Sequence, residues 1–408
     1  MNPAPLDRIV IVGASLAGVT AAKTLRTEGF RGTITMVGDE DHAPYDRPPL
    51  SKQVLTGAWE TDRTVLPAGA DAELDLTWEL GVAAAGLDLA GREVRLTDGR
   101  CLPYDGLVIA CGAAPRRIPG TEGLAGVFSL RTLDDAVGVR AHLETGARRV
   151  VVVGAGFIGA EVAASCRARG AEVTMVEPLP QPLARVLGED MGRVIGEIHV
   201  EHGVDLRLGT GVERIDGGDE ADGLTVHLSD GTSVEADLVV VGIGVVPNTG
   251  WLEGSGLRLD DGVVCDATTL AAPGVVAAGD VARWPNALFG EVMRVEHWEH
   301  AVDMGAHAAR RLLASDEDAV AYAPVPWFWS DQYDRKLQLA GRVRPDDEVA
   351  VVAGSLEERK FAALYGRGGM VVGALALNMP ARVVRYRQAI ANGLTWADAM
   401  AALDPAAS

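Results

Sequence analysis

The stretch from Arg148 to Glu177, RRVVVVGAGFIGAEVAASCRARGAEVTMVE, constrains the fold more than any other part of this sequence. The consecutive valines Val150 to Val153 are typical of a strand buried on both faces of a parallel sheet. Gly154, Gly156 and Gly159 then form G-x-G-x-x-G. In that motif the first glycine permits a tight turn, the second lets backbone approach a pyrophosphate, and the third lets helix pack on strand.

This unit of strand, glycine turn, helix and second strand predicts a dinucleotide site. Phe157 and Ile158 stand at the start of the predicted helix, where free N–H groups and the helix dipole favour phosphate oxygens. The second strand ends at Glu177, and a carboxylate there accepts the ribose 2′-hydroxyl but repels a 2′-phosphate. No Lys or Arg follows before Arg185, so we expect NADH rather than NADPH. A structural turn in a nucleotide-free sheet is the alternative, since the chain contains 49 glycines.

A second unit of the same kind begins near the N-terminus. The predicted strand Arg8 to Val12 leads into a glycine turn and a helix to about Glu28. Serine takes the middle glycine position, where its hydroxyl is able to donate to a phosphate. A further strand, Ile34 to Val37, is followed by Asp39, the expected ribose partner. The turn residues are Gly13, Ala14, Ser15, Leu16, Ala17 and Gly18. Two such units imply two dinucleotides, usually FAD and a nicotinamide.

Length and composition narrow the class of protein. The 408 residues suggest two or three domains, and 48% hydrophobic with 23% charged residues indicates a soluble globular protein. A net charge of −20 argues against binding nucleic acid or anionic membranes, which attract clusters of Lys and Arg. Ile9 to Ala22 lacks the basic leader of a signal peptide, and no segment reaches the ~18 apolar residues of a membrane span. We expect a cytoplasmic protein.

Several longer motifs carry a resemblance to a known family. They are PYDRPPLSK, GASLAG, GAGFIGAE, VVVGIGVVPN, VVAAGDVA, VEHWEHA and PWFWSDQY. Together they resemble the oxygenase-coupled NADH:ferredoxin reductases, and the resemblance covers nearly the whole chain. It implies an α/β fold with two Rossmann-like dinucleotide-binding domains and a C-terminal α+β domain. The FAD-binding domain (1–111 and 244–322) is expected to be interrupted by the NAD-binding domain (112–243), with the C-terminal domain at 323–408.

The resemblance also assigns roles to individual residues. Lys52 is expected beside flavin N5, paired with Glu161; the alternatives are a solvated lysine and an acid that merely suits a helix start. Phe157 would shield the flavin, or belong to the core. Asp280 would bind a ribityl hydroxyl, and Trp298 would offer its backbone N–H at a helix start. Further cofactor contacts are implied for Arg47, Ala84, Arg131, Gly244 and Trp329, the last near the exit to ferredoxin.

The implied activity is transfer of a hydride from NADH to FAD and of single electrons to an iron–sulfur ferredoxin that serves a monooxygenase or dioxygenase. Three alternatives stay open. One is a rubredoxin reductase or another NADH dehydrogenase of the same fold. Another is a disulfide or peroxide reductase, which needs a cysteine soon after the first unit, yet none precedes Cys101. The third is an interaction protein of the apoptosis-inducing-factor kind, which would need a basic surface.

Cysteines and histidines give no sign of a redox dithiol or a metal site. Cys101, Cys111, Cys166 and Cys265 are scattered without C-x-x-C spacing, which indicates a reducing compartment. The family has Thr where Cys111 stands. Among the clustered histidines His297, His300 and His307, no Cys or acid completes a ligand shell at the usual spacing, so no metal is expected.

The last part of the chain differs in composition from the rest. From Ala323 it is rich in Pro, Trp and β-branched residues. This predicts an antiparallel sheet, closed by helices from Arg382 onward. The segments expected in that sheet are Trp327 to Arg342, Val349 to Ala353, Phe361 to Tyr365 and Met370 to Leu377.

Overall fold

The computed structural model describes residues 6–67, 74–217 and 223–403, which fall into two compact units. The first unit comprises Met1–Asp46, Thr64–Ala114 and Val246–Pro326. The second comprises Arg47–Arg63, Pro115–Val245 and Trp327–Ser408. Each unit is thus assembled from three separate segments of the chain. The four domain segments expected from the sequence stay predictions.

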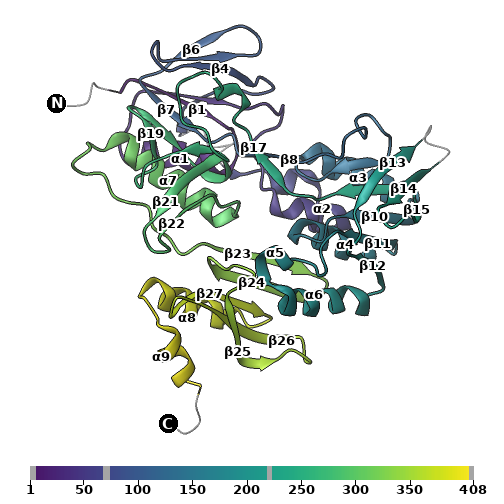
Figure 1. Cartoon of the computed structure of the whole chain (residues 1–408). Coiled ribbons are helices and arrows are strands. Elements are labelled where there is room, and N and C mark those ends of the chain that lie inside the picture. The colour runs from purple at the N-terminus through teal and green to yellow at the C-terminus, as the bar shows by residue number, and fades with distance from the viewer. Residues whose placement is uncertain (1–5, 68–73, 218–222, 404–408) are drawn as a thin grey trace. The chain divides into compact units, whose positions relative to one another are not determined.

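The first unit is built on a six-stranded sheet of order β19-β20-β7-β1-β2-β3 (Figure 1). All neighbouring strands run parallel except β19, which pairs antiparallel with β20. Ile9 to Val12 of the central strand are buried, as the apolar run predicted. The strands are β1 (Arg8–Val12), β2 (Thr33–Val37), β3 (Leu76–Glu79), β7 (Gly106–Ile109), β19 (Leu270–Ala272) and β20 (Val275–Ala277).

Two helices of the first unit lie side by side, α1 (Leu16–Thr27) and α7 (Trp298–Leu313) (Figure 1). Gly305 permits this close approach, because a Cβ there would lie 2.5 Å from the carbonyl oxygen of Ala17. The start of α7 at Trp298 agrees with the sequence prediction. Two small three-stranded sheets complete the unit: β4 (Ala84–Asp88), β5 (Glu93–Leu96) and β6 (Cys101–Pro103); and β18 (Val263–Val264), β21 (Ala282–Asn286) and β22 (Glu291–Met293).

The second unit contains a five-stranded parallel sheet of order β12-β11-β10-β16-β9. The valines of β10 are buried on both sides, as a central strand requires. Its strands are β9 (Val127–Ser129), β10 (Arg149–Val153), β11 (Glu172–Glu177), β12 (Val204–Leu208) and β16 (Leu238–Val241). A three-stranded antiparallel sheet is formed by β13 (Val212–Gly217), β14 (Leu224–Leu228) and β15 (Ser233–Ala236).

The starts of α3 and α4 follow from their local sequences. Thr132 and Asp135 form a reciprocal capping box at the start of α3, which satisfies backbone donors that would otherwise lack partners. Gly156 stands at the N-cap of α4. The helices are α2 (Gln53–Thr56), α3 (Leu133–Thr145), α4 (Phe157–Ala168), α5 (Ala184–Leu187) and α6 (Glu189–Glu201); the short η1 helix (Pro48–Ser51) precedes α2.

The C-terminal part of the second unit is a five-stranded antiparallel sheet of order β23-β24-β27-β26-β25. Its strands are β23 (Trp327–Gln332), β24 (Arg335–Gly341), β25 (Glu348–Ser355), β26 (Lys360–Arg367) and β27 (Met370–Leu377). The helices α8 (Pro380–Ala391) and α9 (Trp396–Ala401) follow it (Figure 1). The predicted antiparallel sheet and closing helices are therefore present.

Two local details of this part differ from the prediction. The segment Trp327 to Arg342 is a hairpin of two strands, because Tyr333 adopts a left-handed backbone (φ +56°) and reverses the chain. Helix α8 begins at Pro380 rather than Arg382, since proline fits the first turn, where its missing N–H would have no helical acceptor. Within the described residues, no helix is long and apolar enough to cross a membrane.

Candidate functional site

In the glycine turn after β10, two glycines are required by contacts within the chain and a third leaves space for a ligand. A Cβ on Gly154 (φ +98°) would lie 2.4 Å from the carbonyl oxygen of Gly242, and one on Gly159 would lie 2.1 Å from that of Gly154. Chain packing therefore explains these two glycines. Gly156 differs, because its φ is negative and no described atom lies within 4 Å of an added Cβ. The space left by this glycine at the helix start fits a dinucleotide pyrophosphate.

Glu177 lies at this same turn. Its Oε2 accepts a hydrogen bond from the backbone N–H of Ala155 at 2.8 Å, and its Oε1 accepts from that of Leu179 at 3.1 Å. The side chain is buried, so these bonds hold the carboxylate at the end of β11. Each oxygen has a second lone pair, which leaves acceptor capacity for a ribose hydroxyl. The structure thus brings the predicted ribose partner to the predicted phosphate turn.

The turn after β1 repeats the geometry. Gly13 has φ +121°, and a Cβ on Gly18 would lie 2.0 Å from the carbonyl oxygen of Gly13. Ser15 is the N-cap of α1, and among the described residues its hydroxyl makes no capping bond. That hydroxyl and the free N–H groups of the first turn, which includes Leu16 and Ala17, suit a second dinucleotide phosphate. Asp39 is exposed two residues beyond β2.

The structure brings together Lys52 and Glu161, which lie far apart in sequence. The Lys52 Nζ donates to Oε2 of Glu161 at 2.6 Å, and their side chains are 13% and 4% exposed. Two serines complete the bonding of the carboxylate: Ser51 Oγ donates to Oε2 at 2.5 Å, and Ser330 Oγ donates to Oε1 at 2.8 Å. A buried ion pair is stable only when further hydrogen bonds satisfy its charges, and here they do. A solvated Lys52 is therefore excluded.

Neither serine was assigned a role from the sequence. Ser51 adjoins Lys52 in PPLSK, and Ser330 belongs to PWFWSDQY, so both stand inside motifs that carried the resemblance. No spacing rule links them to Glu161, because the contacts join η1, α4 and β23. The proximity of Ser51 to Lys52 was the only signal available.

The remaining predicted residues of the second unit occupy varied positions. Arg47 donates from Nη1 to the carbonyl oxygen of Arg131 at 2.6 Å, so these two are neighbours. Gly244 has φ +95° and accepts from the backbone N–H of Arg116. Ile158, which follows Phe157 in α4, is 47% exposed.

Two predicted aromatic residues belong to ring pairs. Phe157 packs edge to face on Phe328, with ring centroids 4.5 Å apart. Trp329 stacks on Trp327 with centroids 5.4 Å apart. Phe157 is half-buried and packs against neighbouring apolar side chains, and its shielding of flavin stays a prediction.

In the first unit, the other predicted residues lie at element ends. Asp280 is in the η6 turn (Gly279–Val281) just beyond β20, the edge where open α/β sheets bind ligands. Trp298 is the first residue of α7, and its indole Nε1 donates to Oδ1 of Asp46 at 2.6 Å. The indole is thus engaged by the protein, and a role for the backbone N–H of Trp298 stays a prediction. Ala84 is half-buried at the start of β4.

The cysteines have the properties of packed or exposed thiols rather than of a redox pair. All four are free, and burial raises the pKa of Cys111 to about 11 and the pKa values of Cys166 and Cys265 to about 12. Protonated thiols are poor nucleophiles, because the thiolate is the reactive form. The Sγ of Cys111 instead lies 3.2 Å from the carbonyl oxygen of Asn248, to which it donates. Cys101 is exposed on β6.

The histidines of α7 belong to an aromatic cluster. His300 stacks on Trp284 with ring centroids 4.8 Å apart, and its Nδ1 lies 3.3 Å from the hydroxyl of Tyr322. His307 also packs on Tyr322. Burial lowers the pKa of His300 to about 3, which keeps the ring neutral. Over the residues that the structure covers, no group of three His, Cys, Asp or Glu side chains is arranged to hold a metal ion.

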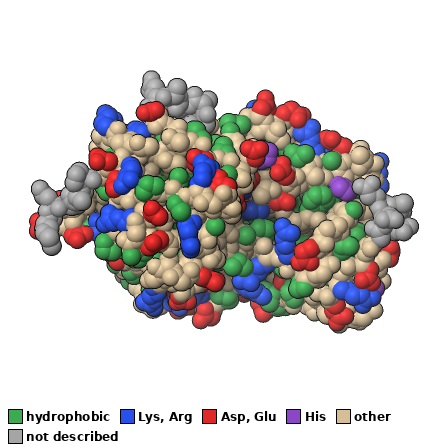
Figure 2. Space-filling model, turned by 90° about the horizontal axis from the view of Figure 1, so that it is seen from above, with side chains coloured by type: hydrophobic (Ala, Val, Ile, Leu, Met, Phe, Trp, Pro, Cys, Tyr) green, Lys and Arg blue, Asp and Glu red, His purple; other side chains and the backbone are tan. Residues whose placement is uncertain are grey.

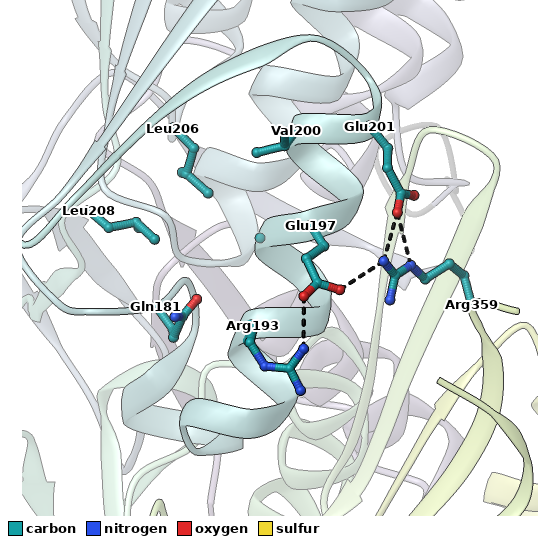
Figure 3. Close-up of a pocket in the computed structure, with 9 residues that line it drawn as sticks. Gln181, Arg193, Glu197, Val200, Glu201, Leu206, Leu208 and Arg359 are labelled. Atoms are coloured by element: carbon teal, nitrogen blue, oxygen red, sulfur yellow. Dashed lines mark hydrogen bonds and ion pairs between the residues drawn. The ribbon is translucent and has the colours of Figure 1, made fainter. Parts of the chain in front are cut away.

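A surface pocket of about 350 Å³ lies beside α6 in the second unit (Figure 3). Its apolar wall includes Val200, Leu206 and Leu208. At its rim Arg359 pairs with Glu197 and Glu201, at 2.8 and 2.7 Å (Figure 3). These ion pairs join α6 to the residue before β26. None of the predicted cofactor residues lines this pocket.

Charged side chains are intermixed on the face shown in Figure 2, where Lys and Arg of the described residues stand among Asp and Glu. A nucleic-acid-binding surface requires basic side chains gathered along a stripe or patch. Together with the net charge of −20, this distribution counts against the interaction-protein alternative.

Two glycine turns in parallel sheets define a dinucleotide-dependent oxidoreductase fold, and the helix after one of them carries Glu161, the acid of the buried lysine–glutamate pair. The chain belongs to the pyridine nucleotide-disulphide oxidoreductase family, which matches residues 7–305, and residues 327–408 match the reductase C-terminal family.

Two relatives of this chain are reductases by name. Rhodocoxin reductase of Rhodococcus erythropolis is 39% identical, over 94% of this chain and 89% of its own length. The ferredoxin–NAD(+) reductase component of the p-cumate 2,3-dioxygenase system of Pseudomonas putida is also 39% identical, over 82% of this chain and 81% of its own length.

Solved structures similar to this chain are also reductases by name. The ferredoxin reductase for the CYP199A2 system from Rhodopseudomonas palustris has a TM-score of 0.91 and 34% identity, covering 98% of both chains. The reductase chain in the covalent putidaredoxin reductase–putidaredoxin complex has a TM-score of 0.89 and 34% identity, covering 95% of this chain and 93% of that one. The predicted α/β fold and family resemblance are confirmed.

Proposed function

We propose that this chain is an FAD-containing NADH:ferredoxin oxidoreductase that supplies an oxygenase with electrons through an iron–sulfur ferredoxin. The single observation that carries the proposal is the buried Lys52–Glu161 pair, in which the acid stands one turn into the helix that begins at the second glycine turn. Two relatives support this choice of partner, since they are named as ferredoxin–NAD(+) reductase components of dioxygenase systems.

Each glycine turn is proposed to hold one dinucleotide. The turn from Gly13 to Gly18, with Asp39 and Asp280, would hold FAD. The turn from Gly154 to Gly159, with Glu177, would hold NADH. When bound, FAD accepts a hydride from NADH and releases electrons one at a time, which a ferredoxin requires.

The chain's own contribution is binding, orientation and electrostatics. Glu161 and Ser51 restrain Lys52, whose ammonium supplies a fixed positive charge. A fixed charge in a poorly hydrated site stabilises developing negative charge without reorganising at the moment of reaction. We assign this charge to the flavin edge that receives the hydride. Glu177 selects NADH by accepting from the adenosine ribose.

The proposed location is the cytoplasm. The thiols of Cys101, Cys111, Cys166 and Cys265 are unpaired in the structure, and disulfides are rare in the reducing cytoplasm. A rubredoxin in place of the ferredoxin is the second candidate acceptor, because it accepts single electrons by the same route.

The test is to reconstitute the purified protein with FAD and to follow NADH oxidation against a panel of two-iron ferredoxins, three-iron ferredoxins and rubredoxins. Reduction of a ferredoxin with NADH, and at least tenfold less with NADPH, is the expected result, because a buried bond to a charged acceptor contributes about 1.5–3 kcal/mol. Turnover with a disulfide or peroxide but with no iron–sulfur or rubredoxin acceptor would overturn the proposal.

A further inference from the structure

Three side chains from two separate segments of the chain donate to Glu161. Ser51 and Lys52 come from the loop that ends η1, and both bind Oε2. Ser330 comes from β23 and is the donor to Oε1 among the described residues. Glu161 is 3% exposed and Ser330 is fully buried, so water does not substitute for these bonds.

Strand geometry directs one face of β23 at helix α4. Successive side chains of a strand point to opposite faces, so Phe328, Ser330 and Gln332 share a face. Phe328 packs on Phe157 at the start of α4, and Ser330 reaches Glu161 one turn further along. This face of the C-terminal sheet therefore lies along the first turns of α4.

Gln332 fixes the direction of the serine hydroxyl. Its Nε2 donates to Oγ of Ser330 at 3.2 Å, and Gln332 is 3% exposed. Because an amide N–H₂ only donates, Ser330 accepts there, and its own proton is directed to Glu161. The result is a one-way chain of hydrogen bonds from Gln332 through Ser330 to the carboxylate.

The bond to Oε1 has a specific mechanical consequence. The terminal torsion of a glutamate is broad and weakly restrained, so bonds to one oxygen alone leave the carboxylate plane able to turn. With Ser330 on Oε1 and Lys52 on Oε2, the plane is fixed at two points. Fixing Oε2 in turn fixes the Nζ of Lys52.

We propose that Ser330 is a positioning residue that holds the Glu161 carboxylate, and through it the Lys52 ammonium, in the orientation used for flavin reduction. This rests on the proposed function. It implies that the C-terminal domain, a separate family match at residues 327–408, contributes a side chain to the reducing site.

The experiment compares Ser330→Thr with Ser330→Val, which have the same shape and differ only by the hydroxyl. Stopped-flow reduction of the FAD-loaded protein by NADH gives a limiting rate constant and an apparent Kd. We expect Thr to stay within about twofold of the parent and Val to lower the limiting rate constant by about tenfold, with the Kd unchanged, since small misplacements near the chemistry have effects of this size. Thr121→Val is the control, because it removes a buried hydroxyl that binds the carbonyl oxygen of Ile118 instead.

A second readout needs no activity. The thermal unfolding midpoint of the FAD-free protein should be about 2 °C lower for Ser330→Val than for Ser330→Thr. The differences between the Thr and Val variants in rate constant and in unfolding midpoint should both vanish when Glu161→Ala is added, because Ser330 then has no carboxylate to hold. Should the added methyl prevent folding in both variants, Ser330→Ala is compared with the parent, with and without Glu161→Ala.

Equal rate constants for the Thr and Val variants, or a difference that persists beside Glu161→Ala, would overturn the positioning role. Failure of the proposed function gives a different outcome: the parent itself would not be reduced by NADH, while the unfolding comparison would still report the contact between Ser330 and Glu161.

Discussion

Lys52 donates from Nζ to Oε2 of Glu161 at 2.6 Å, although the two residues are 109 positions apart in the chain. The pair joins the end of the PYDRPPLSK loop to helix α4. A dinucleotide turn opens this helix, so the fold brings the lysine of one motif to the glycine turn of another.

Replacing Lys52 with Met should slow reduction of bound flavin by about tenfold to a hundredfold, the size of effect seen when one stabilising donor is removed. FAD should remain bound, because the proposed phosphate and ribityl contacts involve other residues. Stopped-flow absorbance measures the rate, and the flavin content of the purified variant measures binding. Lys336→Met is the control, since Lys336 is an exposed lysine on β24. An unchanged rate in Lys52→Met would refute the proposed role.

The Glu177→Ala variant should use NADH less efficiently by one to two orders of magnitude. A hydrogen bond to a charged acceptor contributes about 1.5–3 kcal/mol, and the backbone donors of Ala155 and Leu179 would also lose their partner. The measurement is kcat/KM with NADH and with NADPH. Glu172→Ala, at the exposed start of the same strand, should leave both values unchanged. A parent protein equally efficient with both nucleotides would contradict the assigned role of Glu177.

Removing all four cysteines should leave ferredoxin reduction within a few-fold of the parent. Cys101 and Cys111 would be changed to Ser, and the buried Cys166 and Cys265 to Ala, which limits the loss to packing. A disulfide reductase must pass electrons through sulfur, so its turnover would cease. A tenfold or greater loss in a variant that retains FAD would restore the disulfide-reductase alternative.

Stability should fall on mild acidification, in part through His300. Burial lowers its pKa to about 3, whereas the unfolded chain takes up this proton near pH 6.5. Below pH 6.5 the unfolded state therefore binds more protons than the folded state. The contribution of neutral His300 to the free energy of unfolding is complete above that pH and is lost as the pH falls toward 3. Between pH 6.5 and 5 the loss is about 2 kcal/mol.

The His300→Phe variant tests this effect, because Phe retains the ring stack on Trp284 and has no proton to gain. Denaturant unfolding at pH 7 and pH 5 should show a smaller loss of unfolding free energy for the variant than for the parent. Equal losses would mean that His300 does not contribute to acid sensitivity.

The sequence by itself determined the local units. The strand, glycine turn, helix and acid of Arg148 to Glu177 were predictable because backbone geometry sets them over a short stretch: Gly154 must adopt positive φ, and Gly159 must meet the carbonyl oxygen of Gly154. The start of α7 at Trp298 and the antiparallel C-terminal sheet followed in the same way from periodicity and composition. The pairing of Lys52 with Glu161 was available only through resemblance to a family.

Tertiary structure alone decided the partners of Glu161. Ser330 lies 169 positions from Glu161, and only the packing of the Phe328 face of β23 on α4 brings its hydroxyl within 2.8 Å. The hairpin reversal at Tyr333 likewise depends on a single residue with φ +56°. Local patterns report backbone preferences and buried faces. The identity of a contact across segments is set by how those faces pack, and no spacing within one segment encodes it.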